Sequence, residues 1–102
     1  MASGTIKCKK ANNLGSSVNL IDYGAGRAYI APTDGYLLLI CPNGNYANGR
    51  IYGNTSSLYI DLVCNRAGAL GTTNIAFVRQ GMKVLYVSGT TGAQAYFIPI
   101  VE

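Results

Sequence analysis

The sequence of 102 residues contains no histidine and no tryptophan, and only 12% of its residues are charged. Histidine is the side chain that most often serves as a general base or a metal ligand near neutral pH, so its absence disfavours many enzyme classes. Zinc sites need Cys and His at short spacing, and calcium sites need grouped carboxylates; neither pattern occurs here. We therefore predict a protein that is not an enzyme and that has no metal site and no cofactor.

The chain has four carboxylate side chains, of Asp22, Asp34, Asp61 and Glu102. A glycosidase needs two carboxylates a few ångströms apart. Only an approach of Asp22 to Asp61 across strands would supply such a pair, because Asp34 is best explained by a turn. A glycan-degrading enzyme is thus the least favoured of the functions considered.

The three cysteines, Cys8, Cys41 and Cys64, are odd in number and widely spaced, unlike those of a disulfide scaffold. Each lies in an apparent strand, so we predict buried thiols in a chain made in a reducing compartment. No charged-then-apolar leader is visible, and no apolar run approaches the length of a membrane span. We expect no membrane insertion.

The net charge is +4, and three of the cations, Lys7, Lys9 and Lys10, lie close together. A basic patch can attract nucleic acid. No aromatic residue lies among these lysines to stack on bases, however, and lysines on an edge strand also prevent unwanted pairing between sheets. We favour the edge-strand interpretation and predict no nucleic-acid partner.

Glycine and asparagine interrupt the sequence at short intervals, and no apolar spacing of three and four residues is sustained. This rhythm is typical of sandwiches and barrels. We predict one all-β domain over residues 1–102, with residues 1–4 as a disordered or linking N-terminus, and an antiparallel jelly-roll sandwich of about eight to ten strands. The expected strands are Thr5–Lys10, Ser17–Asp22, Arg27–Ala31, Gly35–Cys41, Tyr46–Tyr52, Ser57–Cys64, Asn74–Arg79, Lys83–Ser88 and Ala93–Val101.

Two turn signals stand out among these strands. Asp34 and Gly35 follow Pro32 and are interpreted as a turn, in which glycine permits positive φ. Asn48-Gly49 is a strong hairpin signal inside the expected strand Tyr46–Tyr52.

Three of the expected strands are apolar on both faces: Gly35–Cys41, Met82–Val87 and Ala95–Val101. One face can fill the sandwich core, and the other needs a cover, which a second copy of the chain would provide. The alternatives are a closed barrel or a monomer with exposed apolar side chains. The residues expected at the interface are Tyr36, Leu38, Ile40, Tyr86, Tyr96, Ile98 and Ile100.

The segment 43–57 is rich in tyrosine, asparagine and serine, the composition of adaptable binding loops. Aromatic rings beside amide groups also suit sugars. The alternative is a set of ordinary hairpin turns with cross-strand tyrosine pairs. The candidate ligand-binding residues are Asn45, Tyr46, Asn48, Arg50, Tyr52 and Asn54.

Three short blocks, 29–36, 78–84 and 95–100, resemble a known group of proteins. Tyr-Ile-Ala-Pro-Thr-Asp-Gly-Tyr is similar to the segment that leads into the core strand of small trimeric jelly rolls, which include complement and tumour-necrosis-factor-like heads and bacteriophage tail-fibre heads. Val-Arg-Gln-Gly-Met-Lys-Val resembles their turn between two strands, and Ala-Tyr-Phe-Ile-Pro-Ile resembles their closing strand. The sequence departs from the pattern at Met82, where the family often has aspartate.

The phage branch fits better than the complement branch, because neither a secretion signal nor a Gly-X-Y repeat is visible. The resemblance implies a homotrimeric phage or prophage fibre head that binds a cell-surface receptor, often a glycan. It also implies a protein made in the bacterial cytoplasm and located in the virion. The alternative is a structural virion or assembly module with no receptor of its own.

Overall fold

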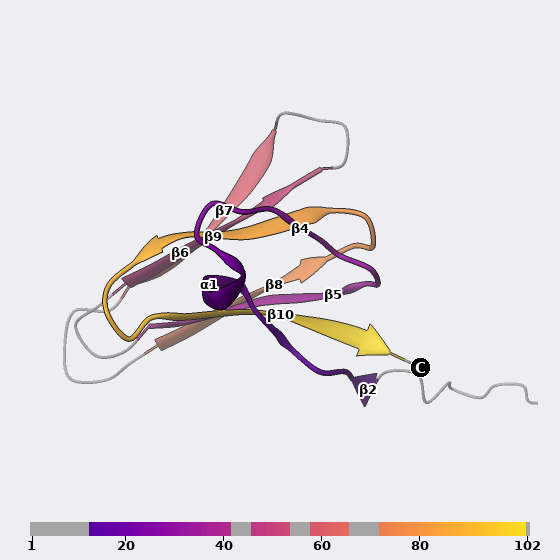
Figure 1. Ribbon diagram of the computed structural model, residues 1–102, viewed down its shortest axis with the longest axis horizontal. Coiled ribbons are helices and arrows are strands. Elements are labelled where there is room, and N and C mark those ends of the chain that lie inside the picture. Colours follow the sequence, from indigo (N-terminus) through magenta and orange to yellow (C-terminus); the bar gives the residue numbers. More distant parts are fainter. Residues whose placement is uncertain (1–12, 42–45, 54–57, 66–71, 102) are drawn as a thin grey trace, which may run out of the picture.

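The computed structural model describes residues 13–41, 46–53, 58–65 and 72–101. The expected strand Thr5–Lys10, which contains Cys8 and the three clustered lysines, lies outside these residues. Within them are nine strands and one four-residue helix (Figure 1). The elements are β2 (Asn13–Leu14), β3 (Val18–Asn19), α1 (Leu20–Tyr23), β4 (Tyr29–Ile30), β5 (Gly35–Cys41), β6 (Tyr46–Tyr52), β7 (Tyr59–Asn65), β8 (Thr72–Val78), β9 (Lys83–Gly89) and β10 (Gln94–Val101).

The strands form two antiparallel sheets that pack face to face. The first sheet has the order β2-β10-β5-β8, with β3 also paired to β10, and the second has the order β4-β9-β6-β7. In Figure 1 the second sheet lies above the first. From β3 onward the chain crosses between the sheets at every step except the β6–β7 hairpin, so most sheet neighbours are distant in sequence. This arrangement is a jelly roll, and the predicted fold is confirmed.

Alternation along β5 shows how the core is built. Leu37, Leu39 and Cys41 have no exposed surface, whereas the side chains between them are partly exposed on the outer face of the first sheet. Phe97 of β10 is also fully buried. Cys41 and Cys64 are both buried thiols, as predicted.

The three blocks that carry the family resemblance meet at one end of the sandwich. The backbone amide of Ile100 donates to the carbonyl of Asp34 at 2.8 Å, and the amide of Gly81 donates to the carbonyl of Ala31 at 2.8 Å. Gly35 does not adopt the positive φ expected of it. It is required for space, because a Cβ there would meet the carbonyl oxygen of Ile98 and lie 2.6 Å from Cζ of Phe97.

The prediction of a strand over Ser17–Asp22 is wrong for most of its length. The strand β3 is followed directly by the single turn of α1. The side chain of Asn19 accepts hydrogen bonds from the amides of Ile21 at 3.0 Å and Asp22 at 3.1 Å. These bonds cap the helix N-terminus and favour a turn over continued extension.

Of the two interpretations of Tyr46–Tyr52, the continuous strand is correct and the hairpin at Asn48-Gly49 is wrong, because β6 runs through both residues without a turn. The irregularity lies instead in β9: Asn48 pairs with Ser88 and Gly49 pairs with Tyr86, which leaves Val87 as an extra residue in a β-bulge. Gly49 faces the core, where a Cβ would lie 3.1 Å from a methyl group of Leu37.

Candidate functional site

The outer face of the first sheet is apolar over three neighbouring strands. Phe77 of β8 lies opposite Tyr36 of β5, with ring centroids 5.8 Å apart. Phe77 is 50% exposed and Ile75, two residues earlier, is 54% exposed. We call this surface the apolar sheet face. Its members are Tyr36, Leu38, Ile40, Ile75, Phe77, Tyr96, Ile98 and Ile100.

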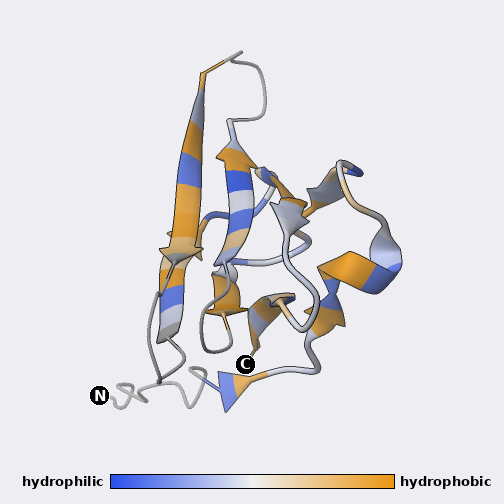
Figure 2. Ribbon diagram, turned by 90° about the vertical axis from the view of Figure 1, so that its left-hand side faces the viewer, coloured by the Kyte–Doolittle hydropathy of each residue, from blue (hydrophilic) through white to orange (hydrophobic). Residues whose placement is uncertain are grey.

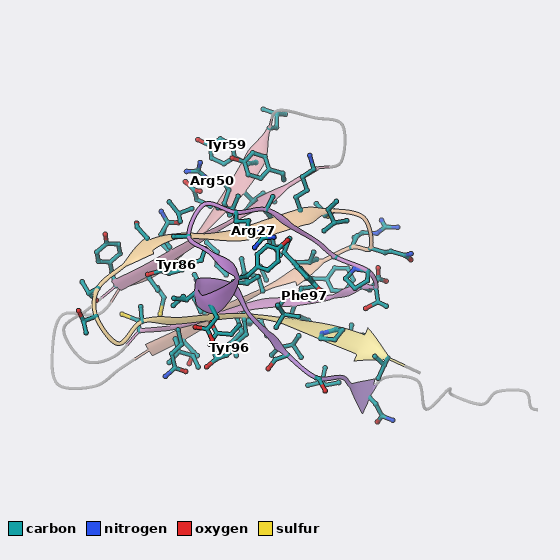
Figure 3. The ribbon with its side chains drawn as sticks, viewed as in Figure 1. Arg27, Arg50, Tyr59, Tyr86, Tyr96 and Phe97 are labelled. Atoms are coloured by element: carbon teal, nitrogen blue, oxygen red, sulfur yellow. The ribbon has the colours of Figure 1, made fainter. Side chains whose placement is uncertain are left out.

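Six of the seven residues predicted for a subunit interface lie on the apolar sheet face. Figure 3 shows Tyr96 pointing away from the interior, in contrast to its neighbour Phe97. Ile75 and Phe77 were missed, although they alternate with Ala76 and Val78 in the sequence. That alternation identified a strand, but it did not show that the strand lies beside β5.

For the seventh residue, Tyr86, the structure corrects the prediction. It is only 7% exposed and belongs to the hydrophobic core. It lies opposite Gly49, and its hydroxyl occupies the space that a Cβ on Gly89 would need. The two glycines thus leave room for the ring inside the sandwich, so Tyr86 cannot contribute to an outer surface.

The outer face of the second sheet carries an aromatic and charged group of side chains on the β6–β7 hairpin. Arg50 lies opposite Asp61, and Tyr52 lies opposite Tyr59. We call these four residues the Arg50 cluster. The hairpin projects beyond the rest of the sandwich (Figures 1 and 2), and Figure 3 shows Arg50 and Tyr59 side by side on it.

Arg50 is held by hydrogen bonds and by ring stacking. Its Nε donates to Oδ1 of Asp61 at 2.6 Å, and its Nη2 donates to Oδ2 at 3.5 Å. Its Cζ lies 4.0 Å from the centroid of the Tyr59 ring. The hydrogen bonds to Asp61, and secondarily the Tyr52 hydroxyl, raise the pKa of Arg50 above its ordinary value. The cation is therefore balanced within the protein.

Tyr46 and Asn48 continue the same outer face along β6. Tyr46 is 38% exposed, and its hydroxyl lies 3.5 Å from Oγ of Ser88. Its backbone amide donates to Oγ1 of Thr90 at 3.1 Å, which joins β6 to the turn between β9 and β10. The Oδ1 atom of Asn48 is buried and has no hydrogen-bond partner.

Four of the six predicted ligand-binding residues thus share one face of β6: Tyr46, Asn48, Arg50 and Tyr52. Asn45 and Asn54 lie outside the described residues. Tyr59 and Asp61 were not predicted as site residues, and their sequence signal was weak because it depends on the register of the hairpin. The predicted binding segment therefore forms one strand of a two-stranded surface, and the other strand is β7.

A separate apolar groove of about 390 Å³ adjoins the projecting part of the hairpin. Leu58 and Ile60 are 79% and 60% exposed there. The only hydroxyl group in its lining is that of Tyr59, so the groove offers little for polar recognition. Its lining residues are Ile51, Gly53, Leu58, Tyr59, Ile60 and Met82.

The two carboxylates considered for catalysis belong to separate parts of the fold. Asp22 lies in α1, which packs against β3, β9 and β10, whereas Asp61 lies in β7, which packs against β5, β6 and β8. Among the described residues, no three His, Cys, Asp or Glu side chains are grouped as a metal site would require. No helix in that part of the chain has the length and apolar character to cross a membrane.

No protein-family model matches this chain, and neither the curated proteins nor the solved structures contain a significant match. The resemblance to trimeric phage heads therefore stays a prediction made from three short sequence blocks. The jelly-roll fold does not depend on it, because the strand order establishes that fold directly.

Proposed function

We propose that this protein is a non-enzymatic, homotrimeric head of the phage or prophage tail-fibre type, located in the virion, that binds a cell-surface receptor. The observation that carries the proposal is the apolar sheet face. Large exposed apolar patches on small proteins usually mark contact surfaces. Aromatic and aliphatic side chains on three adjacent strands form such a patch here, with Phe77 50% exposed.

The chemical difference between the outer faces of the two sheets supports the proposal. The first sheet has an apolar outer face suited to contact between copies of the chain, and a closed symmetric assembly would cover it. The second sheet carries tyrosine, arginine and asparagine on its outer face, the side chains that favour recognition of polar partners. The choice of three subunits comes from the sequence resemblance.

Two measurements test the proposal. Sedimentation velocity at micromolar concentration should give three times the mass of the chain, and a monomer would contradict the assembly. The trimer should adsorb to bacterial cells, with binding reduced by replacing Tyr46 and Tyr52 together with alanine. The double variant should keep the mass of the wild type, because both side chains lie on the other sheet.

A structural virion module with no receptor of its own is the second candidate. It is favoured by the ion pair between Arg50 and Asp61, in which Nε of Arg50 lies 2.6 Å from Oδ1 of Asp61. Polar groups that bind each other in this way are less available to a ligand. A glycan array separates the two candidates: specific binding favours the receptor-binding head, whereas a trimer that binds neither glycans nor cells favours the structural module.

A further inference from the structure

We propose that the Arg50 cluster binds a neutral saccharide and that Asp61, rather than Arg50, forms the hydrogen bonds with the hydroxyl groups of the ligand. The inference rests on the proposed function, since it names the class of receptor that the second sheet recognises. It follows from which polar groups of the cluster are already engaged and which are open to solvent.

The charge of the arginine is compensated. Two of its five N–H donors, on Nε and Nη2, point at Asp61, at 2.6 and 3.5 Å, and its planar face lies on the ring of Tyr59 at 4.0 Å. Its side chain is 24% exposed, compared with 39% for that of Asp61. The charges of the pair balance and the carboxylate is its more exposed member, so this surface offers an anionic sugar no net attraction, and the carboxylate repels it.

The carboxylate has hydrogen-bonding capacity left. An ionised carboxylate offers about four lone-pair sites on its two oxygens, and Arg50 occupies one on each of them. Sugar hydroxyl groups are donors, and hydrogen bonds to an ionised acceptor are stronger than those between neutral groups. Asp61 can therefore accept from one or two hydroxyls of a ligand without releasing Arg50.

The tyrosine rings provide the apolar half of the site. Tyr59 is 49% exposed, and its ring centroid lies 5.5 Å from that of Tyr52 at an interplanar angle of 49°. A pyranose ring has C–H groups on its faces and hydroxyls around its rim. The C–H groups can pack on an exposed aromatic ring while the rim reaches Asp61, which belongs to the same strand and face as Tyr59.

Arg27 provides a useful contrast. Its Cζ lies 4.1 Å from the ring of Tyr23, so it too is an arginine stacked on a tyrosine. Its Nη1 donates to the carbonyl of Tyr23 at 3.1 Å, and within the described residues no carboxylate forms an ion pair with it. Stacking alone therefore does not distinguish the two arginines; the Asp61 carboxylate does.

The experiment is a ¹H–¹⁵N NMR titration of the full chain with two sets of probes. Lactose, maltotriose and N,N′,N″-triacetylchitotriose are the neutral probes, and 3′-sialyllactose and trigalacturonate are the anionic ones. We expect at least one neutral probe to shift the Arg50 Nε–H and the amides of Tyr59 and Asp61. Asp61→Asn should weaken that binding about tenfold, as expected for loss of a hydrogen bond to a charged group.

Asp61→Asn should also give the anionic probes an affinity that the wild type lacks, because it removes the charge that balances Arg50. Asp22→Asn is the matched control: it changes the net charge equally at an exposed position in α1 and should alter neither affinity. Tyr59→Ala should abolish binding and Tyr59→Phe should retain it, with unchanged amide spectra elsewhere showing that both variants fold.

Two results would overturn the inference alone and leave the proposed function in place. One is wild-type binding of an anionic probe that Arg50→Gln abolishes and Arg27→Gln leaves intact. The other is adsorption of the wild type to cells with no competition from any neutral probe, in which case the proposed receptor-binding function stands and the ligand class is wrong. Failure to bind any cell or any sugar would overturn both proposals.

Discussion

The Oδ1 atom of Asp34 accepts a hydrogen bond from the backbone amide of Gln80 at 2.8 Å, although 46 residues separate the two in sequence. The side chain therefore stabilises the distant turn between β8 and β9. At the same turn, the amide of Arg79 lies 3.4 Å from Sδ of Met82. Met82 stands where the resembling family often has aspartate, and here a carboxylate reaches the turn from Asp34 instead.

This contact predicts a specific loss of stability. Asp34→Ala leaves the amide of Gln80 without its acceptor and should lower the free energy of unfolding by about 1–2 kcal/mol. Asp34→Asn keeps an oxygen at the same position and should retain about half of that contribution or more. Urea unfolding followed by circular dichroism measures both. Asp22 is exposed like Asp34 but lies in α1, so an equal loss in Asp22→Ala would show that the Gln80 bond has no particular role.

Gly35 is predicted to be intolerant of any side chain. A Cβ at this position would meet the carbonyl of Ile98 and lie within 2.8 Å of two ring carbons of Phe97, which is fully buried. Because neither the backbone nor the packed ring can yield easily, Gly35→Ala should lower the free energy of unfolding by about 3 kcal/mol.

The control for Gly35 is Gly81→Ala. Gly81 has φ of +88°, and no neighbouring atom lies within 4 Å of the position that a Cβ would occupy there. Only backbone strain of about 1–2 kcal/mol therefore opposes the substitution. If Gly81→Ala proved the more damaging of the two in urea unfolding, close packing at Gly35 would not be the reason for its glycine.

The strands that could be predicted best are those bounded by turn residues. The limits of β5 and β6 were predicted to the residue, because glycine, proline and asparagine lie at their ends. The helix α1 has only four residues, too few for helical periodicity to appear. The order of strands within the sheets could not be predicted, since it depends on contacts between residues far apart in sequence.

Only the β6 half of the candidate site could be predicted, because its other half also depends on contacts between distant residues. Alternation placed Arg50 and Tyr52 on one face of a strand, but their partners depend on hairpin register. The hairpin signal at Asn48-Gly49 left open whether the residues before Arg50 belong to the same strand, and nothing in the sequence pairs that strand with Asp61. The bulge in β9 was likewise invisible in the sequence, and Tyr86 was therefore assigned to the wrong surface.

Adjacent leucines of β5 should respond differently to the same charge. Leu37 has no exposed surface, so Leu37→Glu buries a carboxylate in the core and should unfold the domain, because such a charge costs several kcal/mol. Leu38 faces outward on the apolar sheet face. Leu38→Glu should leave the circular dichroism spectrum unchanged and convert the proposed trimer into monomers in sedimentation velocity.

Arg50→Glu provides a control for the leucine pair, because it alters charge on the outer face of the other sheet. It should leave the sedimenting mass as in the wild type. A folded Leu38→Glu variant that kept the wild-type oligomeric mass would contradict the assignment of the apolar sheet face as the subunit interface.

The hydroxyl of the core residue Tyr86 predicts a loss of stability at alkaline pH. Burial raises the pKa of Tyr86 above its ordinary value, and the negative potential from Tyr46 adds to the shift. The folded state therefore holds this proton more tightly than the unfolded state. The resulting stability is fully present below pH of about 10, the pKa of an unperturbed tyrosine, and is lost as the pH rises towards the higher pKa of the folded state. In that interval the free energy of unfolding should fall by up to about 1.4 kcal/mol per pH unit.

Tyr86→Phe removes the titrating group and should flatten this part of the pH dependence, as measured by urea midpoints between about pH 8 and 11. Tyr96→Phe is the matched control, because Tyr96 is a partly exposed tyrosine on the apolar sheet face and its hydroxyl donates to Oε1 of Gln94 at 3.0 Å. Its profile should follow that of the wild type. A wild-type slope that persisted in Tyr86→Phe would mean that another group, and not the core tyrosine, controls alkaline unfolding.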